Sequence, residues 1–76
     1  MDSEKPSIRV EQSMYQISNE GVEFRRYSAK YDDPNDYSNT TVEIGASREE
    51  ALEKLYHALE YKGFDRATLP EPRQVY

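Results

Sequence analysis

The stretch SREEALEKLYHALEYKG, residues 47–63, predicts one amphipathic helix over 47–62. The Ser47 hydroxyl can cap the first turn, and Glu50 can reach back to the Ser47 N–H, which completes a capping box. At the other end Gly63 can take the left-handed conformation of a Schellman motif, with Phe64 packing back onto Leu59. The sequence therefore defines both ends of this helix.

The predicted helix has one apolar face and one charged face. At about 100° per residue, the apolar arc holds Ala51, Leu52, Leu55, Ala58 and Leu59, with Tyr56 at its edge. The opposite face holds Glu50, Glu53, Lys54, His57, Glu60 and Tyr61. We therefore expect the apolar arc to cover a sheet formed by the preceding residues.

The residues before the helix predict three strands, at 8–17, 22–31 and 40–44. If 18–21 forms a hairpin loop, the facing pairs are Ile8 with Tyr31, Val10 with Ala29, and Ile17 with Val22. Both strands change their apolar face around 12–14 and 25–27. This change indicates either a bulged, twisted hairpin or a sheet covered on both faces. In the third strand we expect Val42 and Ile44 to point inward.

These elements predict a single small domain over residues 1–76. It begins with a loose N-terminus at 1–7 and ends with an extended tail at 64–76, where Pro70 and Pro72 prevent a helix. The expected fold class is α+β, a three-stranded antiparallel sheet packed against one C-terminal helix.

Composition narrows the functional classes. The 76 residues include no cysteine, which rules out disulfides and thiolate metal sites. The net charge of −5 opposes binding to nucleic acid and membranes and favours a protein partner with a basic surface. No apolar run approaches the roughly 20 residues of a membrane span. The first residues also lack the features of a signal peptide, which predicts a cytoplasmic protein.

Catalytic and metal motifs are absent from the sequence. His57 is the single histidine, and there is no nucleophile elbow or glycine-rich phosphate loop, so we expect no enzyme and no cofactor. The acidic loop at 32–39 offers carboxylate and amide oxygens that could bind calcium. An EF-hand loop starting at Asp32 would need glycine in place of Tyr37 and an oxygen ligand in place of Pro34. We therefore expect no metal.

Tyrosines and charged side chains mark the expected contact surface. We expect the partner to bind Arg25, Arg26, Tyr27, Tyr31, Asp32, Asp33, Asp36 and Tyr37. The cations Arg9, Arg25, Arg26 and Lys30 also alternate with Tyr27 and Tyr31 on the hairpin, a mixture typical of single-stranded nucleic-acid binders. Glutamates on the same strands interrupt that basic surface, which makes nucleic acid the weaker alternative.

Two segments resemble HicB-like antitoxin domains. GASREEALEKL at 45–55 is similar to the strand exit and helix start of that family, and LPEP at 69–72 is similar to the segment after its helix. The resemblance covers about the last third of the chain. It implies a small sheet-and-helix module that masks a basic, RNA-cleaving toxin.

The sequence thus favours a small acidic, non-catalytic protein-binding module, an accessory or inhibitory factor of bacteria or phage that masks a partner protein. One alternative is a HicB-like antitoxin. Another is a homodimer formed through an uncovered sheet face or an edge strand. The last is a weak single-stranded nucleic-acid binder that uses the hairpin.

Overall fold

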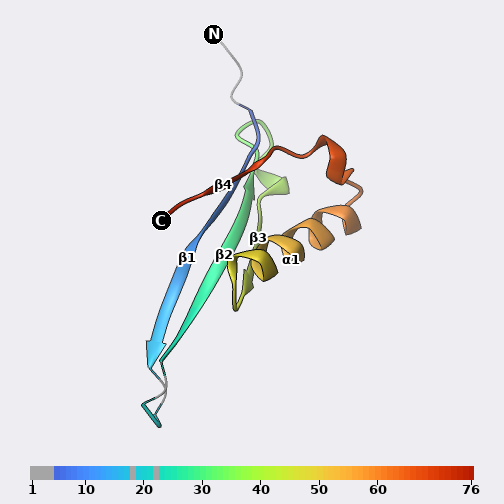
Figure 1. Ribbon diagram of the computed structural model, residues 1–76. Coiled ribbons are helices and arrows are strands. Elements are labelled where there is room, and N and C mark those ends of the chain that lie inside the picture. The colour runs from blue at the N-terminus through green and yellow to red at the C-terminus, as the bar shows by residue number, and fades with distance from the viewer. Residues whose placement is uncertain (1–4, 18, 22) are drawn as a thin grey trace.

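The computed structural model describes residues 5–17, 19–21 and 23–76. Its strands are β1 (Ser7–Ile17), β2 (Glu23–Asp32), β3 (Thr41–Gly45) and β4 (Pro72–Gln74). The α-helix is α1 (Arg48–Tyr61), and the short 3-10 helices are η1 (Tyr37–Asn39) and η2 (Arg66–Thr68). The chain measures 51 × 28 × 20 Å, because β1 and β2 extend well past the body formed around α1 (Figure 1).

The tail adds a strand to the sheet. Strand order is β3-β2-β1-β4, with β1 antiparallel to β2 and parallel to β4. The prediction of a three-stranded antiparallel sheet is therefore wrong. The prolines predict an extended tail, but the pairing of β4 with β1 depends on the tail returning across the molecule, which no local pattern determines. Pro72 fits there because the first residue of an edge strand needs no ladder N–H.

The N-terminus of α1 is capped at the predicted residue. Ser47 Oγ accepts a hydrogen bond of 3.0 Å from the Glu50 N–H. The predicted return bond from the Ser47 N–H to the Glu50 carboxylate is not among the hydrogen bonds of the described residues. Lys54, one turn further on, lies 3.2 Å from the same carboxylate. Lys54 first, and then the Ala46 N–H, hold the pKa of Glu50 below its ordinary value.

The C-terminus of α1 has the predicted Schellman motif. The Phe64 N–H donates to the Leu59 carbonyl and the Gly63 N–H to the Glu60 carbonyl, each at 3.0 Å. Gly63 has a φ of 101°, in the region that favours glycine. The motif directs Phe64 back to the sheet, where its ring centroid lies 5.4 Å from that of Tyr31.

The β1–β2 hairpin has a register shift at the predicted place. Two predicted pairs are present, Ile8 with Tyr31 and Val10 with Ala29. The register then shifts between Gln12 and Met14, because β1 has one residue more than β2 at this point. Beyond the shift Ile17 pairs with Glu23, whereas the sequence predicts Val22 as its partner. Val22 itself lies outside the described residues.

Strand β3 turns the opposite face to the helix from the one predicted. Thr41 and Gly45 are buried, whereas Val42 is 48% and Ile44 41% exposed. The prediction that Val42 and Ile44 point inward is therefore wrong. A Cβ on Gly45 would lie 2.5 Å from the backbone nitrogen of Ala51, so β3 passes α1 at a distance only glycine allows. Because side chains alternate along a strand, this contact directs Val42 and Ile44 away from α1.

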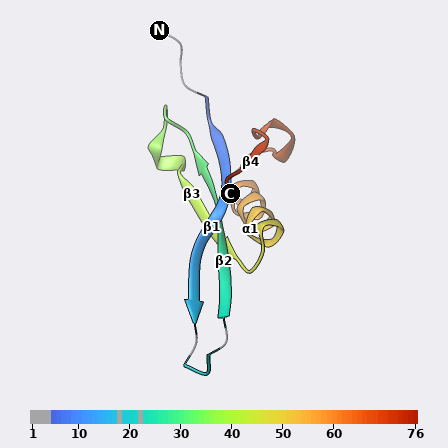
Figure 2. The same cartoon turned by 60° about the vertical axis from the view of Figure 1, so that its left-hand side comes forward.

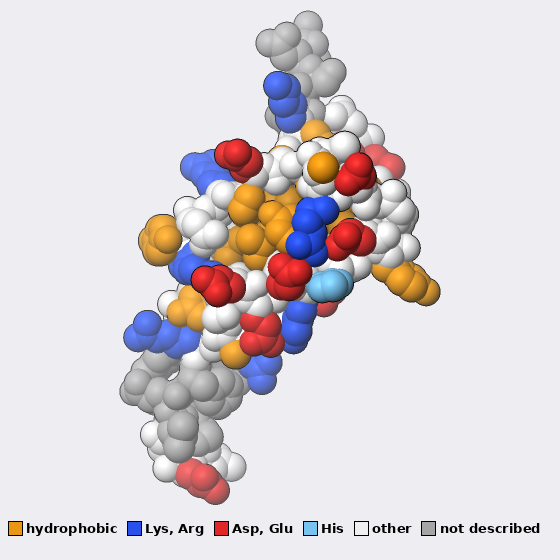
Figure 3. Space-filling model, turned by 45° about the vertical axis from the view of Figure 1, so that its right-hand side comes forward, with side chains coloured by type: hydrophobic (Ala, Val, Ile, Leu, Met, Phe, Trp, Pro, Cys, Tyr) orange, Lys and Arg blue, Asp and Glu red, His pale blue; other side chains and the backbone are white. Residues whose placement is uncertain are grey.

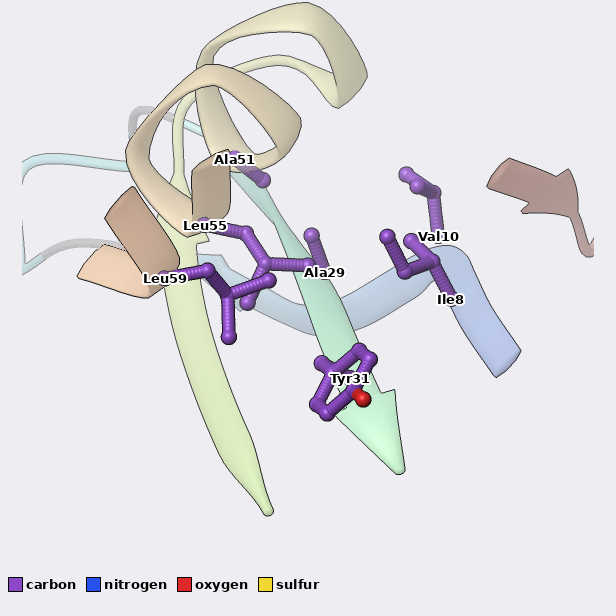
Figure 4. Close-up of a cluster of buried hydrophobic side chains, with 7 residues drawn as sticks. All are labelled: Ile8, Val10, Ala29, Tyr31, Ala51, Leu55 and Leu59. Carbon is purple, nitrogen blue, oxygen red and sulfur yellow. The ribbon is translucent and has the colours of Figure 1, made fainter. Parts of the chain in front are cut away.

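The core lies between α1 and the sheet. Figure 4 shows its seven buried side chains, which are Ile8, Val10, Ala29, Tyr31, Ala51, Leu55 and Leu59. The three from α1 belong to the predicted apolar arc. Leu52 and Tyr56 of the same arc are half-buried and pack against the edge of this cluster.

Arg48 at the start of α1 connects the helix to the tail. Its guanidinium donates hydrogen bonds of 2.9–3.1 Å to the carbonyls of Val10 and Val75 and to the side chain of Gln74. The same group lies 5.2 Å from the ring centroid of Tyr27. Alongside it, the Val75 N–H donates to the Val10 carbonyl at 2.8 Å. Arg48 therefore fixes β4 beside β1.

Replacing Arg48 by glutamine is expected to release β4 while α1 remains folded. Charge-assisted hydrogen bonds of this kind contribute about 1.5–3 kcal/mol each, so amide exchange at Val75 should accelerate at least about tenfold. Hydrogen exchange followed by NMR measures this rate. Arg66→Gln is the matched control, because the Arg66 guanidinium donates to the exposed carboxylates of Glu53 and Glu60 and lies over the Tyr56 ring, away from the Val75 carbonyl that Arg48 binds. Unchanged exchange at Val75 in Arg48→Gln would contradict this role.

Candidate functional site

Helix α1 covers only one face of the sheet. It packs over β2 and β3 (Figures 1 and 2), and within the described residues no helix lies over the opposite face. We call that opposite face the open face. Its side chains are Ser7, Arg9 and Glu11 from β1, Ser28, Lys30 and Asp32 from β2, Val42 and Ile44 from β3, and Arg73 from β4.

The apolar part of the open face lies on β3. Val42 pairs with Lys30 and Ile44 with Ser28, so the two apolar side chains border the polar centre of the sheet. Single apolar side chains on a surface need no explanation. Here two β-branched side chains stand on the same face of one strand, and Lys30 lies directly opposite Val42, a combination of apolar and cationic groups found in protein interfaces.

The basic part of the open face is a row across three strands. Arg9 pairs with Arg73 of β4 on one side and with Lys30 of β2 on the other. Together with Ser7 and Asp32, these three cations line a pocket of about 110 Å³. We call Arg73, Arg9 and Lys30 the cation row. No local sequence pattern predicts the cation row, because Arg73 joins it only through the pairing of β4 with β1.

Of the predicted contact tyrosines, one belongs to the core. Tyr31 is 3% exposed, and burial, followed by the carboxylates of Asp33 and Asp36, raises its pKa above the ordinary value. Tyr31 is therefore not available to a partner. Tyr27 is half-buried beside Arg48.

The predicted acidic residues mainly hold their own loop. Asp33 Oδ1 accepts a hydrogen bond of 2.9 Å from the Asn35 N–H. Asp36 caps η1, accepting from the N–H of Ser38 and from the Asn39 side chain. Most of their hydrogen-bonding capacity thus goes to turn formation. Tyr37 on this loop is 74% exposed.

The structure separates the predicted contact residues into two groups. Arg25 and Arg26 are exposed near one end of β2, whereas Asp32 ends that strand and leads into the acidic loop. Seven residues of extended strand span about 23 Å at 3.3 Å per residue. The predicted set therefore does not form one compact contact surface.

Two of the hairpin cations, Arg9 and Lys30, lie on the opposite face of the sheet from Tyr27 and Tyr31. Tyr27 and Tyr31 face α1, as their contact with the core shows. Lys30 and Arg9 belong to the open face. A single-stranded nucleic acid needs rings and cations along one groove. Of the described hairpin residues, Arg25 and Tyr27 line one hollow together, but Tyr31 is buried in the core and Arg9 and Lys30 stand on the open face, so these rings and cations do not follow one continuous groove.

The outer face of α1 carries charges that compensate one another. Figure 3 shows this side, where the pale blue histidine lies among red and blue side chains. Arg66 lies 3.1 Å from Glu53 and 2.8 Å from Glu60. His57 Nε2 lies 3.5 Å from Glu53, the predicted neighbour one turn away. His57 is exposed, and among the described residues its ion-pair partner is Glu53 and not a hydroxyl side chain that could act as a nucleophile.

An apolar area also appears beside the helix in Figure 3. The apolar side chains that pack half-buried at the edge of the core include Leu52, Tyr56 and Leu69. Arg66 already lies over the Tyr56 ring, 4.7 Å from its centroid. These side chains extend the core toward the tail, and Arg66 partly covers them.

A larger hollow, of about 420 Å³, lies where β4 leaves β1. Its lining includes Glu11, Arg25, Tyr27 and Arg48. The Arg48 guanidinium is occupied by backbone carbonyls, so it is a structural cation at this position. The hollow holds no histidine, serine or cysteine that would act as a nucleophile.

The remaining tests of function concern metals, membranes and similarity. Within residues 5–17, 19–21 and 23–76, no three histidine, aspartate or glutamate side chains gather as a metal ion would require. In the same part of the chain, no helix has the length and apolar character needed to cross a bilayer. No protein-family model matches the chain, and no curated protein or solved structure is significantly similar to it.

Proposed function

We propose that the chain is a non-catalytic protein-binding module that masks part of a partner protein with its open face. The observation that supports this is the exposure of Val42 and Ile44 on the uncovered side of the sheet, next to the cation row. A partner that fits carries an apolar contact for β3 and anionic groups for the cation row. Interfaces combine an apolar centre with arginine in this way.

The structure favours a partner of the opposite charge from the one that the net charge of the sequence favours. Net charge alone favours a basic partner. The structure shows that Lys54 and Arg66 compensate acids on α1. On the open face, by contrast, Lys30 and Arg73 have no ion pair with any described residue. The open face therefore suits an acidic partner.

A different protein fits the open face better than a second copy of the chain. Two copies related by a two-fold axis that passes through the cation row would bring like charges together. Pairing through the edge of β3 is also opposed, because Lys54 Nζ donates to the Ile44 carbonyl at 3.3 Å and charge on an edge prevents strand addition.

The test compares two variants that gain the same charge. Ile44→Glu places a carboxylate in the apolar part of the open face, and Tyr61→Glu places one on α1, where Tyr61 is 95% exposed. Tagged wild type and variants are used to capture partners from the source cells after nuclease treatment. We expect one protein to be retained by wild type and Tyr61→Glu, and its yield to fall at least about tenfold with Ile44→Glu. Circular dichroism checks that each variant is folded.

Other outcomes would overturn the proposal. A partner that Ile44→Glu retains but Glu49→Lys loses would bind α1, and a small basic ribonuclease in that place would support the HicB-like antitoxin alternative. Recovery of the chain alone, with a mass in solution that doubles on concentration, would establish the homodimer. Loss of every bound component on nuclease treatment would indicate nucleic acid.

A further inference from the structure

The cation row brings three like charges together on neighbouring strands. Arg73, Arg9 and Lys30 are directly opposite one another on three neighbouring strands, so their side chains stand on one face of the sheet. Neighbouring strands lie about 4.8 Å apart. Like charges directly opposite each other destabilise a sheet. An anion bound between them would relieve this repulsion.

Local counter-charges compensate the cation row only in part. Arg9 Nε lies 3.6 Å from Glu11, and both side chains are largely solvated. Asp32 lines the pocket, and its Oδ1 accepts a hydrogen bond of 3.4 Å from the Thr40 hydroxyl. Lys30 and Arg73 pair with no carboxylate of residues 5–17, 19–21 or 23–76. The pocket lining, with three cations and one carboxylate, therefore keeps a positive excess.

The size and chemistry of the pocket restrict its ligand. A volume of about 110 Å³ corresponds to a few water molecules at about 30 Å³ each, which suits a small anionic group and excludes an aromatic ring. Two guanidinium groups can each form paired hydrogen bonds to a phosphate. The positive excess favours a phosphate monoester, with a charge of about −1.5 to −2, over a singly charged carboxylate. Ser7 adds a hydroxyl donor at the rim.

From these observations we infer that the cation row is a binding site for a terminal phosphoryl group. The site goes beyond the proposed function and does not depend on it, because a small phosphate compound is enough to occupy the pocket. It also depends on the tail. Arg73 reaches the pocket only while β4 pairs with β1, and Arg48 maintains that pairing. Phosphate binding and tail docking therefore stabilise each other.

NMR titration of the full chain with inorganic phosphate tests this site, at constant ionic strength against sodium chloride. We expect amide shifts at Ser7, Arg9, Lys30 and Arg73. Removing one charge-assisted donor should weaken binding at least about tenfold, in Arg73→Gln and equally in Lys30→Gln. The matched control is Arg25→Gln, which removes a cation outside the pocket and should leave the affinity unchanged. Arg48→Gln, which does not line the pocket, should also weaken binding.

Two further ligands identify the source of the phosphoryl group. A short phosphoserine peptide that binds more tightly than inorganic phosphate, with its unphosphorylated form inactive, indicates a phosphoprotein. Adenosine 5′-monophosphate that binds more tightly indicates a nucleotide, and equal affinities indicate the free ion. Shifts that chloride reproduces, or an affinity that neither Arg73→Gln nor Lys30→Gln changes, would overturn the site.

Discussion

Replacing Gly45 by alanine is expected to destabilise the domain by at least about 3 kcal/mol, at the upper end of overpacking costs. The added Cβ would lie 2.5 Å from the Ala51 nitrogen and 2.9 Å from the Glu50 carbonyl carbon. Both atoms are backbone, so the clash cannot be relieved by rotating a side chain, and β3 or α1 must move. A domain of this size has a free energy of unfolding of only about 4–11 kcal/mol, so the melting temperature should fall sharply.

Gly63→Ala is the matched control for Gly45→Ala. It makes the same chemical change, but no atom lies within 4 Å of the added Cβ. Its cost comes from the φ of 101° and should be about 1–2 kcal/mol. Thermal unfolding followed by circular dichroism compares the two. If Gly45→Ala proved as stable as the wild type, the close approach of β3 to α1 would be refuted.

Truncating Leu55 to alanine is the second large effect we expect. Leu55 is fully buried between α1 and the sheet, so the change removes apolar contacts and leaves a cavity. Such substitutions cost about 2–5 kcal/mol. Urea unfolding should show a lower midpoint with an unchanged slope, because the two-state transition is retained while its free energy falls.

Leu52→Ala removes the same atoms from the same helix at a half-buried position. Its cost should be clearly smaller, because less apolar surface is lost and solvent can fill the space. Equal costs for Leu52 and Leu55 would contradict the orientation of α1. Ile44 also lies outside the core, so Ile44→Glu in the binding test should likewise leave the domain folded.

Local patterns in the sequence account for α1 and for the hairpin register near its base. Ser47 and Gly63 set the helix ends through hydrogen bonds within a few residues along the chain, so the signal is local. The change of apolar face around 12–14 likewise corresponds to the register shift between Gln12 and Met14. In both cases neighbouring residues interact with one another, which a linear pattern can express.

The sequence did not predict the open face or its cation row, because their residues are far apart along the chain and become neighbours only when the strands pair. The expected surface combined Tyr31, which is in the core, with Asp33 and Asp36, which stabilise their own turn. Tyrosine and aspartate suit interfaces as residue types, but burial and hydrogen bonding decide whether they are available. The open face follows instead from which side of the sheet α1 covers.

The sequence by itself determined α1 and the residues that cap it, since each depends on residues close together along the chain. It located the change of face in the hairpin but offered both a bulge and a doubly covered sheet, and the register shift between Gln12 and Met14 decides for the bulge. Only the tertiary structure decided that β4 pairs with β1 and that Val42 and Ile44 point away from the core. The pairing of β4 with β1 depends on the hydrogen bond from Arg48 to the Val75 carbonyl, which joins residues far apart along the chain. The outward direction of Val42 and Ile44 depends on the contact between Gly45 and α1. The two backbones pass so closely there that only glycine fits on the side of β3 that faces α1, and the alternation of side chains then directs Val42 and Ile44 away from the core despite their apolar character.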